Sequence, residues 1–406
     1  MAGLGYFTAD TQGQDGTADV PSRAQNPDGD GRLLCASRSV SASLLTSRFR
    51  SPLQMVEDEV RRLNVAVVGA GYWGPNLVRN FRSSPDFELL WVCDKDVERA
   101  ERVLDGNPNV RSTTSLADVL EDETIDAIAV ATPASTHRAI AGAALEAGKH
   151  VLVEKPLAMS YREGRELVEL ADRHDRILFC DHTYCYTPAV QRIREAVCSG
   201  ELGDILYVDS VRINLGLVQR DIDVLWDLAP HDLAIFDFVL PEDRMPVAVA
   251  AHGADPIGAG RACVGYLTLP LQGNAIAHAH VNWLSPTKVR TMIVGGSKKT
   301  LVWDDLNPSQ RVCLYDRGVD LTDARHAAEE ERREAMISYR SGDMIAPALR
   351  EQEALASALC EFAASIREHR PPLTSGASGL RVLDILESAS RSLEFHGAVV
   401  PLRGER

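Results

Sequence analysis

The stretch NVAVVGAGYWGPNLVRNF, residues 64–81, decides the fold of this chain. Residues 65–68 form an apolar run without polar alternation, which is typical of a central parallel strand covered on both faces. Gly69, Gly71 and Gly74 follow in the spacing G-x-G-x-x-G. At a strand-to-helix turn these glycines permit the tight turn, the approach of the backbone to a pyrophosphate and close packing of the helix. The stretch therefore predicts the start of a dinucleotide-binding unit.

A second apolar segment, residues 89–93, ends at Asp94, which lies about 20 residues beyond the glycines, where a Rossmann unit places an acid for the ribose hydroxyls. Asp94 is also a candidate N-cap for a helix over residues 97–104, and the two roles are compatible. A 2′-phosphate beside Asp94 would be repelled by on the order of a few kcal/mol at an effective dielectric near 20. We therefore expect NAD as the cofactor, with NADP possible because Lys95 offsets part of that repulsion.

The composition limits the classes of function. The 406 residues are 45% hydrophobic and carry a net charge of −15. This charge argues against nucleic acid or an anionic membrane surface as a partner. The sequence has no apolar run of about 18 residues and no secretory signal pattern at its N-terminus, so we expect a cytoplasmic enzyme.

The eight cysteines show no C-x-x-C spacing and no pairing with histidine at zinc-site spacing. Most lie in apolar stretches, where a thiol behaves as a small buried hydrophobe. We expect neither disulfides nor a metal.

Three segments are expected. Residues 1–58 lack periodicity and are predicted to be a disordered extension, with the further hypothesis that translation starts at Met55. Residues 59–182 alternate strand and helix patterns and are predicted to be an NAD(P)-binding Rossmann domain with a doubly wound parallel sheet. Residues 183–406 are predicted to be an α+β domain for substrate binding and oligomerisation.

In the Rossmann domain the ligand crevice lies at the carboxyl ends of the strands. Thr132, Pro133 and His137 follow the fourth predicted strand, and Glu154 and Lys155 follow the fifth. The first group is equally compatible with an ordinary helix start, where Ser and Thr cap and Pro is common. Lys155 is more informative, because a lysine at the end of a buried strand is held in the crevice instead of on a solvated face.

The second domain begins with a helix over residues 189–199 and continues with strands that alternate apolar and polar residues. Such alternation is typical of a large, open, mainly antiparallel sheet with one face buried. Residues 350–393 predict two amphipathic helices. Residues 336–349 lack a clear period and are interpreted as a loop over the active site or a surface linker. The strands are expected at 205–213, 247–251, 261–269, 273–283, 288–295 and 300–304.

One helix of this domain carries titratable residues. Asp227 is interpreted as its N-cap, with Pro230 in the first turn. His231 would then lie near the helix N-terminus, where the dipole disfavours the imidazolium and leaves a neutral ring that can accept a proton. The alternative is a histidine that only satisfies Asp227 within the cap.

Taken together, the sequence resembles the Gfo/Idh/MocA oxidoreductases. The resemblance covers about residues 60–400 and implies that Lys155 is the catalytic lysine. It also implies that Asp227 and His231 are the Asp-x-x-x-His pair, in which Asp227 orients the histidine and the histidine accepts the proton. The motifs are GAGYWG at 69–74, ATPASTH at 131–137, EKP at 154–156, WDLAPH at 226–231 and PLTSGASGL at 372–380.

The resemblance also supplies the remaining expectations. Tyr72 and Trp73 join the cofactor-binding residues, and Tyr184, Asn214 and Trp226 join His231 as substrate-binding residues. The loop at 183–186 departs from many relatives, which carry Asn or Arg there. Family members are commonly homodimers or homotetramers through the open face of the second sheet.

The expected function is NAD(P)-dependent hydride transfer between a nicotinamide and a sugar hydroxyl or ketone, with a nucleotide sugar or sugar derivative as substrate. The alternatives are an inositol or free-sugar dehydrogenase and a non-catalytic protein that senses NAD or a sugar. The presence of Lys155, Asp227 and His231 together favours the enzyme.

Overall fold

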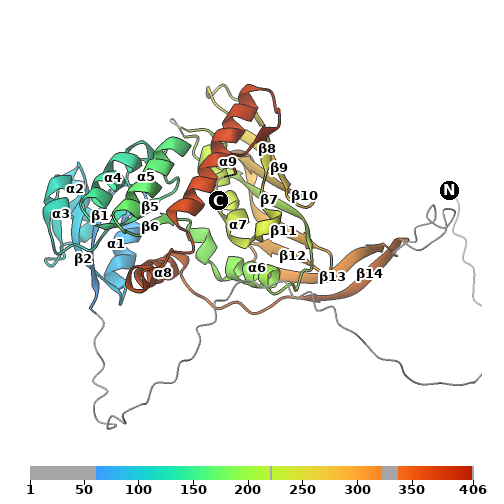
Figure 1. Ribbon diagram of the computed structural model, residues 1–406, viewed down its shortest axis with the longest axis horizontal. Coiled ribbons are helices and arrows are strands. Elements are labelled where there is room, and N and C mark those ends of the chain that lie inside the picture. The colour runs from blue at the N-terminus through green and yellow to red at the C-terminus, as the bar shows by residue number, and fades with distance from the viewer. Residues whose placement is uncertain (1–60, 220–221, 322–336, 405–406) are drawn as a thin grey trace, which may run out of the picture. The chain divides into compact units, whose positions relative to one another are not determined.

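The first domain is built on a six-stranded parallel sheet with the order β3-β2-β1-β4-β5-β6 (Figure 1). The structure, a computed structural model, describes residues 61–219, 222–321 and 337–404. The predicted N-terminal extension, residues 1–58, lies outside the described residues. The elements of this domain are β1 Leu63–Val68, α1 Gly74–Ser83, β2 Phe87–Cys93, α2 Val97–Leu104, β3 Arg111–Thr113, α3 Leu116–Glu121, β4 Ala127–Val130, η1 Ala134–Thr136, α4 His137–Glu146, β5 His150–Glu154, α5 Tyr161–Arg173 and β6 Leu178–Asp181.

The order of these strands positions the crevice. Strand β1 pairs with β2 on one side and with β4 on the other, so the chain reverses its winding direction beside β1. Helices leave in opposite directions at such a switch point and open a crevice at the carboxyl ends of the strands. The apolar run of β1 and all four residues of β4 are buried. The prediction of a doubly wound parallel sheet is confirmed.

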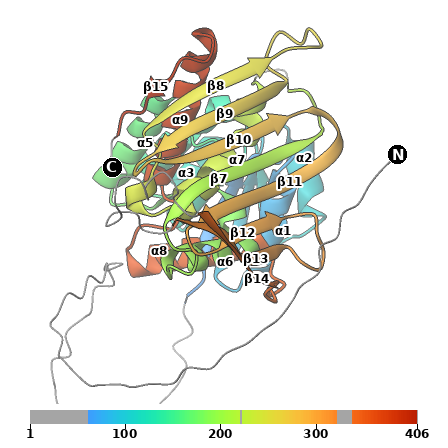
Figure 2. The same cartoon turned by 90° about the vertical axis from the view of Figure 1, so that its right-hand side faces the viewer.

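The second sheet has nine strands in the order β14-β13-β12-β11-β7-β10-β9-β8-β15. Its pairs are antiparallel except for β10 with β7. Figure 2 shows its strands in front and its helices behind, so one face carries no helix of the residues that the structure describes. Its elements are η2 Thr183–Tyr186, α6 Pro188–Cys198, β7 Ile205–Leu215, α7 Val224–Val239, η3 Glu242–Arg244, β8 Ala248–Ala254, β9 Val264–Leu271, β10 Ala275–Asn282, β11 Leu284–Gly296, β12 Thr300–Asp304, β13 Val312–Leu321, β14 Ile337–Ile345, α8 Ala354–Glu368, α9 Gly376–Glu394 and β15 Val400–Pro401.

The expectation of a loop or linker over residues 336–349 is wrong for most of that segment. Residues 337–345 form β14, which pairs antiparallel with β13 as the edge of the sheet (Figure 1). Side chains such as Tyr339 and Val319 are exposed on this hairpin. Because little of it is buried, its sequence lacks the apolar alternation by which a strand is recognised.

The C-terminal tail, which holds α8 and α9, packs on both domains. Helix α8 packs on the Rossmann sheet, where the ring of Phe362 stacks on Phe87 at 5.8 Å and meets Phe179 edge-on at 5.4 Å. The loop before α9 adds to β6, since the Cys180 N–H donates to the Thr374 carbonyl. The tail, which we expected to belong only with the second domain, therefore also braces the first.

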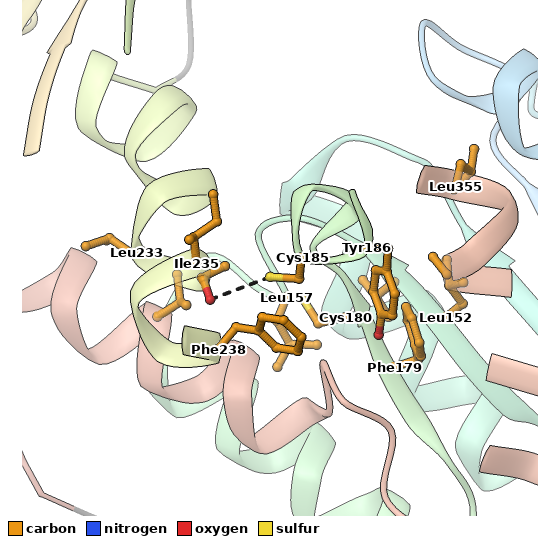
Figure 3. Packing of buried hydrophobic residues seen from close by; sticks show 14 of the residues in the cluster. Leu152, Leu157, Phe179, Cys180, Cys185, Tyr186, Leu233, Ile235, Phe238 and Leu355 are labelled. Atoms are coloured by element: carbon orange, nitrogen blue, oxygen red, sulfur yellow. Dashed lines mark hydrogen bonds between the residues drawn. The ribbon is translucent and has the colours of Figure 1, made fainter. Parts of the chain in front are cut away.

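Two core-facing side chains anchor the loop that follows β6. Figure 3 shows Cys185 directed toward α7, where its thiol donates to the Ala234 carbonyl at 3.6 Å. The ring of Tyr186 stacks on Phe179, and its hydroxyl hydrogen-bonds to Thr374. With these two side chains turned into the core, Thr183 and Tyr184 are left facing the crevice.

A buried ion pair joins α7 to the second sheet. Arg212 of β7 donates two hydrogen bonds to Asp232 of α7, at 2.8 and 3.0 Å, and the Ser210 hydroxyl donates a third at 2.8 Å. Both charged side chains are less than 5% exposed. The pair therefore fixes how α7 lies on the sheet.

We expect Asp232→Ala to lower the free energy of unfolding by about 3–5 kcal/mol, because it leaves the buried Arg212 charge without its partner. Urea unfolding monitored by circular dichroism measures this. The matched control is Asp243→Ala, which removes the exposed partner of Arg244 and should cost less than about 1 kcal/mol. Equal effects of the two substitutions would contradict the role given to Asp232.

Candidate active site

The glycine loop after β1 is closed by contacts that only glycine permits. Gly69 has φ +104°, and a Cβ there would lie 2.6 Å from the Ala131 carbonyl carbon. A Cβ on Gly74 would lie 2.2 Å from the Gly69 oxygen. Around Gly71, in contrast, a Cβ would meet nothing within 4 Å. Two of the glycines therefore serve internal packing, and the third leaves the backbone open to a ligand.

Asp94 holds this loop to the end of β2. Its carboxylate accepts from the Ala70 N–H at 2.7 Å and from the Asp96 N–H at 3.0 Å. Arg99 lies 3.6 Å away. The cap of α2 is Asp96, which accepts from the Arg99 N–H, so the alternative of Asp94 as that cap is wrong. Asp94 instead lies in the crevice beside the glycine loop.

A cavity of about 1110 Å³ runs from this loop across the strand ends to α7. The open backbone at Gly71, the acid at the end of β2 and the free N-terminus of α1 together fit a dinucleotide. Of the predicted cofactor-binding residues, those that line the cavity are Gly69, Gly71, Tyr72, Trp73, Asp94, Thr132, Pro133, Glu154 and Lys155. Their individual contacts with the cofactor stay predictions.

Lys155 lies where the two domains meet. It directly follows β5, and its ammonium donates to the main-chain carbonyl of Asp227 at 3.0 Å. It also lies 3.6 Å from the Asp227 carboxylate, whose other oxygen accepts from the Trp283 indole N–H at 3.0 Å. Asp227 therefore positions Lys155, which corrects the expectation that it orients His231.

The start of α7 differs from the expectation. The helix begins at Val224 and is capped by Asp223, which accepts from the Trp226 N–H, so Asp227 is not the cap. Pro230 lies inside the helix. Proline lacks the N–H that would bond to the carbonyl four residues back, which here is that of Trp226. The next carbonyl along the helix, that of Asp227, accepts from Lys155.

His231 consequently lies in the second turn of α7, too far from the end for the helix dipole to act strongly. Its ring is neutral for a different reason. Burial, followed by the charges of Lys155 and Arg212, lowers the pKa of His231 well below its ordinary value. Among the residues that the structure describes, no hydrogen bond to its ring is present, so both ring nitrogens are available to a substrate.

Tyr184 lies next to His231 in the lining of the cavity. Its ring meets the imidazole edge-on at a centroid distance of 5.1 Å. The guanidinium of Arg212 lies 4.4 Å from the centre of the phenol ring, and that of Arg290 lies 5.9 Å away. Tyr184 and His231 both line the cavity.

Four predicted site residues do not line the cavity, and the first of them, Gly74, packs against the Gly69 main chain. His137 is buried, and its ring nitrogens lie 2.8 Å from the carbonyls of Pro156 and Thr132. It therefore connects the loop after β4 to the loop after β5. Trp226 donates to the Ser390 hydroxyl at the back of α7. Asn214 lies at the end of β7, against Gly216. Direct ligand contact of His137, Trp226 and Asn214 stays a prediction.

Several residues of the cavity were not predicted. They come from unconnected parts of the chain and share only a polar or charged side chain. No sequence signal pointed to Arg290, because it lies within a strand of ordinary apolar and polar alternation. Asp181 was noted only as the end of the sixth strand. The unpredicted polar lining residues are Arg99, Thr114, Thr136, Asp181, Thr183, Thr187, Gln219 and Arg290.

No cluster of three or more potential metal ligands is present in the described parts of the chain. Nor do those parts include a helix long and apolar enough to cross a membrane. The seven cysteines that they contain are all free thiols, and five of them are buried.

We expect His182 to make the fold acid-sensitive. It is 2% exposed, and burial followed by the Lys155 charge lowers its pKa to about 4. An unfolded histidine titrates near 6.5, so between these values the unfolded chain binds more protons and stability falls as the pH falls. From pH 7 to pH 5 the natural chain should lose about 2 kcal/mol more than His182→Gln in urea unfolding. His174→Gln, at an exposed histidine, should behave like the natural chain, and an unchanged pH profile in His182→Gln would contradict the expectation.

Two family models match the chain. One, the oxidoreductase family with an NAD-binding Rossmann fold, matches residues 63–182, and the GFO/IDH/MocA C-terminal domain matches residues 190–302. Together they cover more than half of the sequence, in the order in which the two sheets occur.

Individual relatives support the same family assignment. UDP-N-acetylglucosamine 3-dehydrogenase of Acidithiobacillus ferrooxidans is 27% identical over 79% of this chain and 94% of its own length. A solved structure of that enzyme superposes with a TM-score of 0.68 at 25% identity, over 83% of this chain and 99% of the other. GenD2 from gentamicin A biosynthesis, in complex with NAD, shares the fold with a TM-score of 0.70 at 24% identity, over 89% and 100% of the two chains. The glycine loop, the Asp94 crevice and both family matches therefore lead to one conclusion: this chain is an NAD-binding oxidoreductase of the Gfo/Idh/MocA family.

Proposed function

We propose that the chain transfers hydride between NAD and a hydroxyl-bearing carbon of a sugar, with a nucleotide sugar as the preferred substrate. The observation that carries this proposal is the convergence of Lys155, from the first domain, and His231, from the second, on one cavity. A cation that donates a hydrogen bond and a neutral imidazole that accepts a proton are groups that suit the oxidation of an alcohol.

Each side chain has a defined task in this proposal. His231, neutral and without a hydrogen bond to its ring among the described residues, takes the proton of the substrate hydroxyl. Lys155, held by Asp227, donates a hydrogen bond to the same oxygen and stabilises the negative charge that develops on it. Bound NAD supplies the hydride acceptor. In the reverse direction, protonated His231 returns the proton to the carbonyl oxygen.

Arg290 supports a charged substrate. It lines the cavity on the side of Tyr184 and His231, and its guanidinium lies 3.5 Å from the Asp305 carboxylate. Arginine is well suited to phosphate because its planar group offers several donors. The relative from A. ferrooxidans is named for a UDP-sugar, which agrees with a diphosphate lying near Arg290.

We expect Lys155→Ala and His231→Ala each to lower turnover by about a hundredfold or more, the usual scale for a group that transfers or stabilises a proton. Both variants should still bind NADH, which can be followed by the change in cofactor fluorescence. Glu166→Gln, on the outer face of α5, is the control and should keep full activity. Normal turnover in either active-site variant would remove that residue from the proposed role.

The substrate class is tested with a panel of UDP- and dTDP-sugars, uronates, free hexoses and inositols, with NAD or NADP and absorbance of the reduced nicotinamide as readout. The proposal expects a signal with nucleotide sugars that is absent in Lys155→Ala. A signal only with inositols or free sugars would reassign the substrate. Silence across the panel despite NADH binding would support a sensing role instead.

We also propose that the protein is a homodimer or homotetramer formed through the open face of the nine-stranded sheet. Tyr266 and Ile276 lie on this face and are 42% and 48% exposed, while their neighbours along the strands are buried against helices. On this face the Tyr266 ring also stacks on His280 at a centroid distance of 4.4 Å. Exposed large apolar side chains on a sheet face suit an interaction surface. The free thiols of the described residues agree with a reducing compartment such as the cytoplasm.

We expect Ile276→Arg combined with Tyr266→Arg to convert the assembly to monomers, because two cations would have to be buried in the interface. Size-exclusion chromatography with light scattering measures the mass. Phe395→Arg changes an even more exposed aromatic residue, 67% exposed and at the end of α9, and should leave the assembly intact. An unchanged mass in the double variant would place the interface elsewhere.

A further inference from the structure

A group of buried polar atoms at the carboxyl ends of β5 and β6 lacks hydrogen-bond partners. Buried polar groups in proteins are almost always paired, so a cluster of unpaired ones indicates a proton or a ligand that completes it. The cluster lies between the glycine loop and Lys155. Its atoms are Trp73 Nε1, Glu154 Oε1, Asp181 Oδ2 and both ring nitrogens of His182.

Glu154 and Asp181 form the centre of this cluster. They are the last residues of β5 and β6 and lie opposite each other in the parallel register. Their carboxyl groups interact with each other, and both residues line the cavity. Asp181 is 1% exposed, and its other oxygen accepts from the Thr183 hydroxyl at 2.9 Å. Two ionised carboxylates would repel each other at this contact, whereas one shared proton supplies a donor between them. The Trp73 indole N–H is the other donor of the cluster, on the side of Asp181.

The surroundings favour a pair with one proton. Lys155 is the cation beside Glu154, and burial followed by repulsion from Asp181 raises the pKa of Glu154 well above its ordinary value. Burial keeps the other neighbours neutral near pH 7, since it raises the pKa of both nearby thiols and of the phenol and lowers the pKa of the histidines. These neighbours are Cys180, His182, Cys185, Tyr186 and, on α7, His231.

The position of the pair connects it to the cofactor. In a Rossmann unit the glycine loop and the acid after the second strand would hold the pyrophosphate and the adenosine ribose, here at β1 and β2. The other half of a dinucleotide would then extend over β4, β5 and β6. The nicotinamide is positively charged when oxidised and neutral when reduced. A second negative charge on the pair is therefore favoured only beside the oxidised form.

We propose that Glu154 and Asp181 hold one proton between them in the free protein and release it when the oxidised cofactor binds, so that the pair favours the oxidised over the reduced nicotinamide. The binding step is balanced, because the protonated protein and NAD⁺ give the complex and one proton. The inference depends on NAD binding in this crevice. It is independent of the sugar substrate and of the proposed roles of Lys155 and His231, and it can fail or hold separately from them.

The test is isothermal titration calorimetry of NAD⁺ and NADH in two buffers of different ionisation enthalpy, which counts the protons exchanged. NAD⁺ binding should release close to one proton near pH 7 and tighten by up to about tenfold per pH unit, whereas NADH binding should do neither. Glu154→Gln keeps the shape of the pair. A neutral amide beside the Asp181 carboxylate also has the same net charge as the pair with one proton. The substitution should abolish the proton release and weaken NAD⁺ binding by about tenfold or more, while NADH binding changes by less than about threefold.

Retained NADH binding shows that a variant is folded, and Asp181→Asn provides a second substitution with the same expected result. The control Glu166→Gln, on the outer face of α5, should keep the proton release. Release that persists in Glu154→Gln would overturn the proposal. Equal weakening of NAD⁺ and NADH by Glu154→Gln would also overturn it, because the pair would then contribute to binding without distinguishing the charge of the nicotinamide.

Discussion

The contact between Lys155 and the Asp227 turn of α7 is the constraint on which the site depends. It joins the end of β5 in the Rossmann sheet to a helix of the second domain, through a hydrogen bond of 3.0 Å to a main-chain carbonyl. Pro230 removes a helical donor in the same turn, and Trp283 binds the Asp227 carboxylate from the second sheet. With α7 held in this way, His231 lies one turn further along on the same helix and reaches the cavity that Lys155 also lines.

The packing beneath the crevice explains motifs that have no direct chemical role. The run at residues 372–380 lets the tail pass across β6, where Thr374 receives hydrogen bonds from the Cys180 main chain and shares one with Tyr186. A Cβ on Gly376 or Gly379 would press on Leu178, Leu157 and the Cys180 thiol. The same contacts turn Tyr186 and Cys185 inward (Figure 3), which leaves Tyr184 on the cavity side. These small residues thus position the site without touching a ligand.

The charges along the cavity differ from end to end. Beside the glycine loop, the Asp94 carboxylate is fixed by two main-chain N–H groups, with Arg99 nearby. In the middle, an acid pair ends β5 and β6. At α7 a neutral imidazole lies among Lys155, Arg212 and Arg290, all cationic. Burial makes these charges more effective than they would be in water. An anionic substrate group and a cationic nicotinamide would therefore be favoured at different places in one crevice.

The sequence by itself determined the Rossmann sheet, its glycine loop and the acid after β2, and it predicted that Lys155 and His231 belong to one site. These features are encoded locally, by an apolar run, by glycine spacing and by residues at strand ends. Only the tertiary structure decided that Asp223 caps α7, that Asp227 holds Lys155 instead of His231, and that His137, Asn214 and Trp226 lie away from the cavity. It also decided that residues 337–345 are a strand, and that Asp181 and Arg290 join the site. The physical reason is that a cap, a hydrogen-bond partner or an exposed edge strand depends on which distant segment lies beside it, and no local period or spacing records that neighbour.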